Sequence, residues 1–80
     1  KETNSFENIS VYPNPTKSNF SIKNIDKETA FNLFNINGKI ILQGIISESN
    51  EINIEEFSKG IYFIELENED MLTVRKIIKK

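Results

Sequence analysis

TAFNLFNINGKIILQGII, residues 29–46, carries the clearest fold signal in the chain. Within it, Asn37-Gly38 stands between two apolar runs. An Asn-Gly pair in this position is the strongest short-range hairpin signal, because a two-residue type I′ turn needs a positive φ at both central residues. The segment therefore predicts an antiparallel hairpin whose strands span residues 29–36 and 39–46.

Further short strands are predicted on both sides of this hairpin, because apolar and polar residues alternate there with a period of two. They span residues 9–12, 19–23, 51–54, 61–67 and 71–79. In the last of them Leu72 and Val74 are expected to face the core, whereas the adjacent Ile77 and Ile78 leave the inward residue undecided. Gly44, inside the return strand of the hairpin, predicts either a β-bulge or the close approach of another group.

About seven short strands, spaced roughly every eight to twelve residues, predict an all-β fold, an antiparallel β-sandwich. The two-sided apolar runs at residues 31–36 and 61–66 require two packed layers, since a single sheet would leave one apolar face in water. Leu, Ile, Val and Phe account for 26 of the 80 residues, well above the ~20 % below which chains are usually disordered. The polar residues 1–8 are expected to form a linker into a single domain of residues 9–80.

A proline-rich motif, Pro13-Asn14-Pro15, ends the first predicted strand. The two prolines remove two backbone donors and fix two φ angles. Asn14 is pushed toward an extended conformation because it precedes a proline. A segment with these constraints lies at a sheet edge or a corner and cannot form a central strand.

The composition argues against several kinds of chemistry. The chain has no cysteine and no histidine, so it offers no disulfide, no thiolate, and neither the commonest general base nor the commonest metal ligand. A serine nucleophile would need a lysine base, and nothing in the sequence marks one. We therefore expect no enzyme activity, no cofactor and no metal. The net charge of −2 argues against a nucleic-acid partner, and no apolar run approaches the ~20 residues that membrane insertion requires.

Three polar features have both a functional and a structural interpretation, and the structural one is favoured for each. The carboxylates of residues 67–70 could bind calcium, but they lack the glycine-punctuated spacing of a calcium loop. Glu55-Glu56 could be a catalytic pair, but adjacent side chains rarely converge on one substrate. Tyr12 and Tyr62 could stack on a sugar, but in a small sandwich a tyrosine usually buries its ring and donates its hydroxyl proton to a backbone carbonyl.

The chain ends in a basic cluster, Lys76, Lys79 and Lys80. Lysines on an edge strand block unwanted pairing with other strands, and composition alone favours that explanation. The alternative is a recognition role, and the order of motifs along the whole chain favours it.

Four motifs follow one another along the chain: VYPNPT at residues 11–16, FNLFNINGK at 31–39, FSKGIYF at 57–63 and KIIK at 76–79. In order, spacing and position this set resembles the C-terminal sorting domain (type A) of the type IX, or Por, secretion system of Bacteroidota. The resemblance runs from about Val11 to Lys80. It implies an immunoglobulin-like β-sandwich, in agreement with the strand count.

The resemblance also implies a secretion signal without catalytic activity. Such a domain ends a secreted enzyme or adhesin and directs that upstream cargo, in the same polypeptide, through an outer-membrane translocon. The implied partners are the type IX translocon, its shuttle and its sortase components, and the implied location is the periplasm in transit, then the medium or the cell surface. A sortase-like peptidase is expected to remove the domain by cutting within residues 1–8. Because the chain begins with Lys1 and its only methionine is Met71, we expect it to be a fragment or a processed product.

By position, the resemblance assigns ten residues to recognition by the translocon. They are Pro13, Asn14, Pro15, Gly38, Lys39, Gly60, Tyr62, Lys76, Lys79 and Lys80. Asn35 stands where the family often has Asp. An alternative function stays open, namely an immunoglobulin-like binding module, for example for carbohydrate, attached to a secreted hydrolase. Position separates the two, because a sorting domain ends its polypeptide whereas a binding module can sit anywhere in it.

Overall fold

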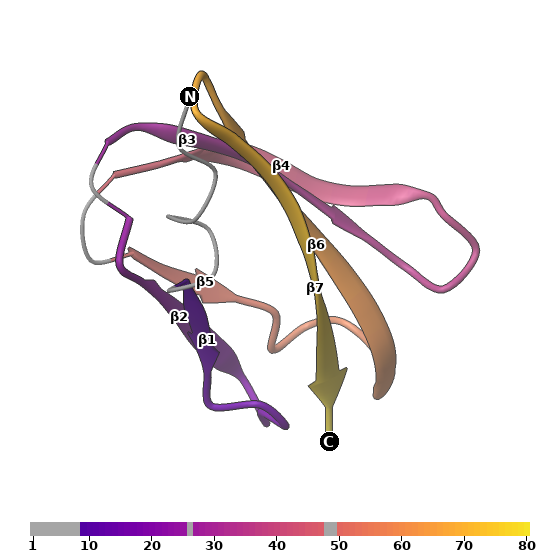
Figure 1. Ribbon diagram of the computed structural model, residues 1–80. Helices are drawn as coiled ribbons and strands as arrows, with labels where there is room; N and C mark the ends of the chain where they lie inside the picture. The colour runs from indigo at the N-terminus through magenta and orange to yellow at the C-terminus, as the bar shows by residue number, and fades with distance from the viewer. Residues whose placement is uncertain (1–8, 26, 48–49) are drawn as a thin grey trace.

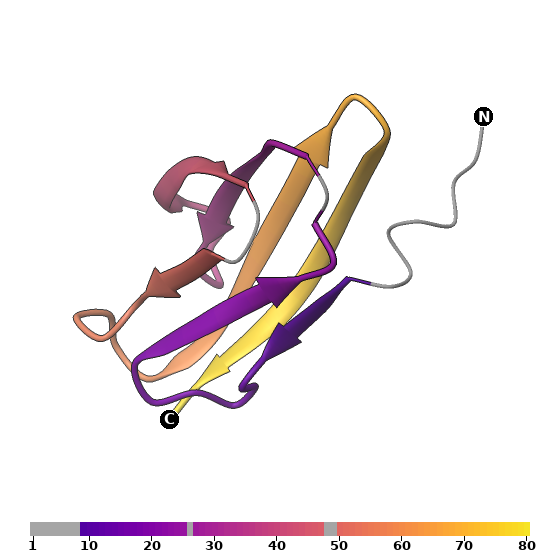
Figure 2. The ribbon, with the colours of Figure 1, turned by 90° about the vertical axis from the view of Figure 1, so that its left-hand side faces the viewer.

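The computed structural model describes residues 9–25, 27–47 and 50–80, which form two antiparallel β-sheets (Figure 1, Figure 2). The strands are β1 (Ser10–Tyr12), β2 (Asn19–Lys23), β3 (Thr29–Phe34), β4 (Ile40–Ile46), β5 (Asn50–Asn53), β6 (Gly60–Asn68) and β7 (Met71–Lys79). This confirms the predicted all-β fold of about seven strands. Within the described ranges no helix has the length and apolarity to cross a membrane. The predicted linker, residues 1–8, lies outside them.

The strands divide into a sheet of order β1-β2-β5 and a sheet of order β4-β3-β6-β7. Neighbouring strands within each sheet run antiparallel. The two sheets face one another, with β1, β2 and β5 in one layer and the longer strands in the other (Figure 1). Two antiparallel sheets packed in this way form the predicted immunoglobulin-like sandwich.

The core lies between the layers and is filled from alternate strand positions, because successive side chains of a strand point to opposite faces. Tyr62, Ile64 and Leu66 of β6 share the buried face, as the sequence predicts. The fully buried apolar side chains come from both layers: Phe20, Ile22, Leu33, Ile54, Ile64, Leu66 and Ile77. Each contributes about 1.5–3 kcal/mol by removing apolar surface from water.

The predicted hairpin is present, but its turn is not of type I′. Only Gly38 has a positive φ, of 87°, whereas that of Asn37 is not positive. The physical reason is the side chain of Asn35, whose Oδ1 accepts hydrogen bonds from the N–H groups of Asn37 (2.9 Å) and Lys39 (3.0 Å). These bonds stabilise a wider loop that ends in a left-handed glycine, which is the next most common hairpin connection.

Gly44 marks a close approach and not a bulge. A Cβ at this position would lie 3.1 Å from Cε2 of the Phe31 ring, so the glycine makes room for that buried side chain. The register of β3 against β4 shifts elsewhere, between Leu33 and Phe34, where Ile41 is the extra residue of β4. Of the two alternatives that the sequence left open, the close approach is therefore the one realised.

The inward residues of β7 differ from the prediction. Leu72 and Val74 are 59 % and 52 % exposed, so the expectation that they face the core is wrong. The buried face instead carries Ile77, which is fully buried, and Met71 packs against the core from the same face. The pattern misled because β7 carries apolar residues on both faces, so alternation alone does not reveal which face meets the other sheet.

The two tyrosines have different environments. The ring of Tyr62 is buried, tilted at 36° against the Phe57 ring, and its hydroxyl donates to the Ser58 carbonyl at 2.5 Å. This is the predicted arrangement, and a tyrosine at the start of this strand that bonds back to the preceding backbone is a hallmark of immunoglobulin-like folds. Tyr12 is 44 % exposed, so its predicted inward ring is wrong. Lys23 Nζ lies 5.1 Å from the centre of the Tyr12 ring, a cation–π contact on the surface.

Candidate recognition site

The motif Pro13-Asn14-Pro15, here called the proline elbow, carries the chain away from the edge of one sheet and onto the other. β1 pairs with β2, and the residues that follow the elbow lie against the end of β7 (Figure 2). The bonds Tyr12–Pro13 and Asn14–Pro15 are both cis. All three elbow residues are exposed, which agrees with the predicted corner.

The side chain of Asn14 attaches the elbow to β7. Its Nδ2 donates to the carbonyl of Lys76 at 2.7 Å, and its Oδ1 accepts from the N–H of Ile78 at 2.9 Å. One carboxamide thus pairs with the donor and the acceptor that a neighbouring strand's backbone would otherwise satisfy. The prolines on either side cannot donate such bonds, so the asparagine side chain takes over the pairing.

Thr16 continues the same contact. Its N–H donates to the carbonyl of Ile78 and its carbonyl accepts from the N–H of Lys80, both at 2.8 Å. Its hydroxyl donates to the carbonyl of Asn19, and the residue is almost fully buried. Thr16 belongs to a sequence motif, but no role is predicted for it from the sequence. The available signal was a threonine in a predicted corner, since Ser and Thr hydroxyls often bond the local backbone in turns.

Eight of the ten predicted recognition residues lie on or beside this contact between the elbow and β7. Besides the elbow and the terminal lysines, Gly60 pairs with Lys79 and Tyr62 with Ile77 across β6 and β7. The other two, Gly38 and Lys39, lie in the β3–β4 hairpin at a different corner of the molecule (Figure 1). We call the elbow with residues 76–80 the elbow–β7 junction.

The predicted recognition residues differ in accessibility. The elbow, Lys76 and Lys80 are exposed, and a partner can reach them directly. Lys79 is only 8 % exposed and Tyr62 is 7 % exposed, so a partner has little access to either side chain, and both contribute to packing. Gly60 has a φ of 146°, which residues with an L side chain rarely adopt, so this glycine is needed for the backbone conformation at the start of β6.

The junction has a cationic rim. Lys17, Lys76 and Lys80 are exposed, and none of them makes an ion pair with another described residue. Lys17 directly follows Thr16, whose backbone bonds to Lys80, so these charges border the same contact. Exposed ammonium groups without an ion-pair partner attract an anionic partner electrostatically, and added salt shortens the range of this attraction.

The acidic turn at residues 67–70 lies at the far end of the β6–β7 hairpin, and one lysine ammonium pairs with two of its three carboxylates. The ammonium of Lys27 bonds to the carboxylate of Asp70 and lies 3.4 Å from that of Glu69. The hydrogen bond that the Lys27 ammonium donates to the Asp70 carboxylate raises the pKa of Lys27 above its ordinary value. A cation of the protein itself therefore sits where calcium would bind, and the described residues contain no group of three or more ligands that could hold a metal.

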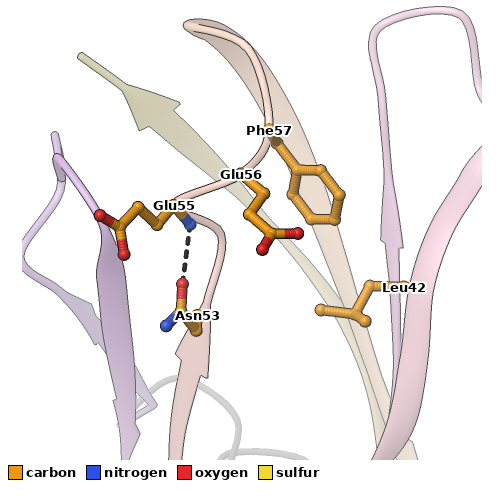
Figure 3. A pocket seen from close by; sticks show the side chains of 5 residues that line it. All are labelled: Leu42, Asn53, Glu55, Glu56 and Phe57. Carbon is orange, nitrogen blue, oxygen red and sulfur yellow. Dashed lines mark hydrogen bonds between the residues drawn. The ribbon is translucent and has the colours of Figure 1, made fainter.

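The adjacent carboxylates of Glu55 and Glu56 line a cavity of about 320 Å³ together with Leu42, Asn53 and Phe57. Their carboxylates point in opposite directions, Glu55 away from the Phe57 ring and Glu56 toward the side of Leu42 (Figure 3). The side chain of Asn53 accepts a bond from the Glu55 N–H at 2.8 Å, which fixes the turn. The two acids do not converge, as expected for neighbouring residues.

Comparison with known proteins identifies the family. The model of the family described as "Secretion system C-terminal sorting domain" matches residues 10–80. The chain therefore belongs to the family of C-terminal sorting domains of the type IX secretion system.

One relative agrees with this assignment, and one solved structure agrees with the fold. The β-agarase A of Zobellia galactanivorans is 32 % identical over 59 residues, which are 70 % of this chain and 11 % of the agarase. A solved structure of PorZ, described as an essential bacterial surface component of the type IX secretion system of Porphyromonas gingivalis, matches with a TM-score of 0.75. That match covers 96 % of this chain and 12 % of PorZ at 13 % identity, so it supports the fold alone. The chain thus spans only a small part of the length of either protein.

Proposed function

We propose that this domain directs an upstream cargo through the outer-membrane translocon of the type IX system, and that the export machinery recognises it, once folded, at the elbow–β7 junction. The supporting observation is the bridge from Asn14 to Lys76 and Ile78. Two motifs at opposite ends of the sequence form one exposed, cationic surface only in the folded chain. Recognition after folding needs such a rigid outer surface and does not need a pocket.

The cargo and its processing form the finer part of the proposal. Since a relative that carries a similar segment is a β-agarase, we expect a secreted enzyme upstream in the same polypeptide, with no catalytic role for the domain. The cargo would pass through the periplasm with a shuttle component and reach the medium or the cell surface. A sortase-like peptidase would then cut within residues 1–8, upstream of the first strand.

The alternative, a carbohydrate-binding module, has less support. A sugar ring stacks on an exposed aromatic face, but Tyr62 is buried and Lys23 lies over the ring of Tyr12. No observation on the described residues favours a sugar over a protein partner.

The test is a secretion assay in a Bacteroidota host that has the type IX system. The full chain is fused behind a signal peptide and a reporter, and the exported fraction is compared with that in a translocon-deficient strain. Export of the wild-type fusion that depends on the translocon supports the proposal, and retention of the fusion in the cell overturns it.

Point variants test the site better than truncation does. Deleting residues 76–80, which the basic ending first suggests, also removes the fully buried Ile77 and would unfold the sandwich. Lys76→Ser changes one exposed lysine of the junction, and Lys23→Ser changes an exposed lysine of β2 with the same loss of charge. We expect Lys76→Ser to lower export and Lys23→Ser to leave it near the wild-type level. Equal export of the two would remove Lys76 from the recognition surface.

A further inference from the structure

We infer that the open edge of β7 from Leu72 to Lys76 is a strand-addition site, which accepts an extended segment of the export machinery. The inference rests on the proposed function and specifies how the partner is held. It concerns the half of β7 that the elbow does not cover (Figure 1).

The direction of the backbone groups follows from the bonds at the elbow. The carbonyl of Lys76, the N–H and the carbonyl of Ile78, and the N–H of Lys80 all bond to Asn14 or Thr16. These groups therefore point away from β6, toward the free edge. In an antiparallel ladder, N–H and C=O of one residue point to the same side, and the side alternates along the strand. The backbone N–H and C=O groups of Leu72 and Val74 consequently point to this free edge as well.

These groups lack partners in the part of the chain that the structure describes. The N–H and carbonyl of Leu72, the N–H of Val74 and the N–H of Lys76 face the edge without a described acceptor or donor. The carbonyl of Val74 has only a long contact, 3.5 Å, with the guanidinium of Arg75. β7 is the last strand of its sheet, so no further strand of the described chain lies beyond it. Natural proteins usually block such an edge, because it is a template for another strand.

The contact with the elbow shows that this edge accepts an added backbone. Thr16 pairs with Lys79 as a parallel bridge, and the pairing ends at the elbow, where proline has no N–H to donate. An incoming segment would continue along the same edge from that point. Continuity with an existing strand contact distinguishes this edge from that of β4, at the opposite side of the sheet.

The exposed side chains beside the edge define the occupant. Leu72 and Val74 are 59 % and 52 % exposed and lie on the same outer face, two residues apart. An added strand with apolar side chains at alternate positions would cover them, while its backbone satisfies the open groups. Lys76, exposed at the end of the edge, favours an acidic residue in that segment. The partner is thus an extended protein segment with alternating apolar residues and a carboxylate.

The first test removes the outward N–H of Val74. Val74→Pro deletes that donor without deleting a bond to β6, because proline is tolerated where the N–H faces away from the ladder. Val74→Ala is the matched control, since it also removes the valine side chain but keeps the N–H. In the secretion assay we expect export of Val74→Pro to fall at least tenfold below that of Val74→Ala. Circular dichroism and thermal unfolding of the purified domain check that both variants are folded.

A second pair of variants does not depend on how the fold tolerates proline. Leu72→Lys places a charge beside the β7 edge, and Ile45→Lys places one beside the β4 edge of the same sheet, where Ile45 is 66 % exposed. We expect Leu72→Lys to lower export and Ile45→Lys to match the wild type. Full export of Val74→Pro and Leu72→Lys would overturn strand addition and leave the proposed function intact. Retention of the wild-type fusion would instead overturn the proposed function.

Sedimentation of the purified chain tests whether the occupant is another copy of the domain. We expect a monomer for the wild type and for Val74→Pro. A wild-type dimer that Val74→Pro converts to a monomer would assign the edge to a second copy and overturn the assignment to the export machinery.

Discussion

Asn14 and Ile78, 64 residues apart in the chain, are joined by a hydrogen bond of 2.9 Å from the Ile78 N–H to the Asn14 side chain. The same carboxamide donates to Lys76 on the other side of Ile77. The proline motif and the basic ending are therefore parts of one structure. A change at either of them alters the surface that both present.

Asn14→Ala removes both bonds of this bridge. Because the bridge lies at an exposed edge where water can replace the carboxamide, we expect the free energy of unfolding to fall by about 1–2 kcal/mol. Urea denaturation followed by circular dichroism measures the loss. Asn37→Ala, in the exposed β3–β4 turn, is the control and should stay within about 0.5 kcal/mol of the wild type. Similar losses for the two variants would show that the bridge contributes little to stability.

Gly38→Ala and Gly60→Ala force alanine into backbone conformations that suit glycine, with φ of 87° and 146°. Nothing lies within 4 Å of the added Cβ in either case. The substitution therefore lowers the free energy of unfolding only through the strained backbone conformation, by roughly 1–2 kcal/mol. Calorimetry should show a fall in Tm of about 4–8 °C per kcal/mol in a domain of this size. Gly38→Asn should recover part of the loss, because asparagine tolerates the left-handed region. A wild-type Tm for Gly60→Ala would refute the backbone role of Gly60.

Tyr62→Phe removes the hydroxyl that bonds the Ser58 carbonyl while keeping the buried ring. We expect a loss of about 0.5–1.5 kcal/mol in the free energy of unfolding. Tyr12→Phe serves as the control, since Tyr12 is exposed, and should change stability by less than about 0.5 kcal/mol. Chemical denaturation of both variants gives the comparison, and a larger effect at Tyr12 than at Tyr62 would contradict the assignment.

Lys27 makes stability depend on alkaline pH. Its pKa is raised from 10.5, mainly by the hydrogen bond with Asp70, so the folded state holds the proton more tightly than the unfolded state. The resulting stabilisation is fully present below pH 10.5 and disappears as the pH rises through the higher folded-state pKa. The stability difference between wild type and Lys27→Gln should therefore be seen at neutral pH and vanish at strongly alkaline pH. A difference that grows with alkaline pH would contradict the ion pair.

The sequence predicts those parts of the fold that depend on local patterns. The hairpin of β3 and β4 follows from Asn37-Gly38 between apolar runs, and the buried face of β6 follows from alternation. The turn type was missed because it depends on the side chain of Asn35, which an aspartate could replace as an acceptor of the same two bonds.

The junction itself could be predicted only in part. The motifs were visible, but no local signal shows that Asn14 reaches a strand more than sixty residues away. The prediction that Leu72 and Val74 face the core was wrong, since both faces of β7 carry apolar residues. Failures of local reasoning tend to occur at functional surfaces, and these two residues border the edge proposed for strand addition.

The most direct test of the account compares export of Asn14→Ala with export of Tyr62→Phe in the secretion assay. Both variants lose hydrogen bonds and are expected to lose similar stability. Only Asn14→Ala breaks bonds to residues 76–80, because the hydroxyl of the buried Tyr62 bonds the Ser58 carbonyl, outside the elbow–β7 junction. If the folded junction is what the machinery recognises, Asn14→Ala is exported several-fold less than Tyr62→Phe. Equal export of the two folded variants would contradict recognition at the junction.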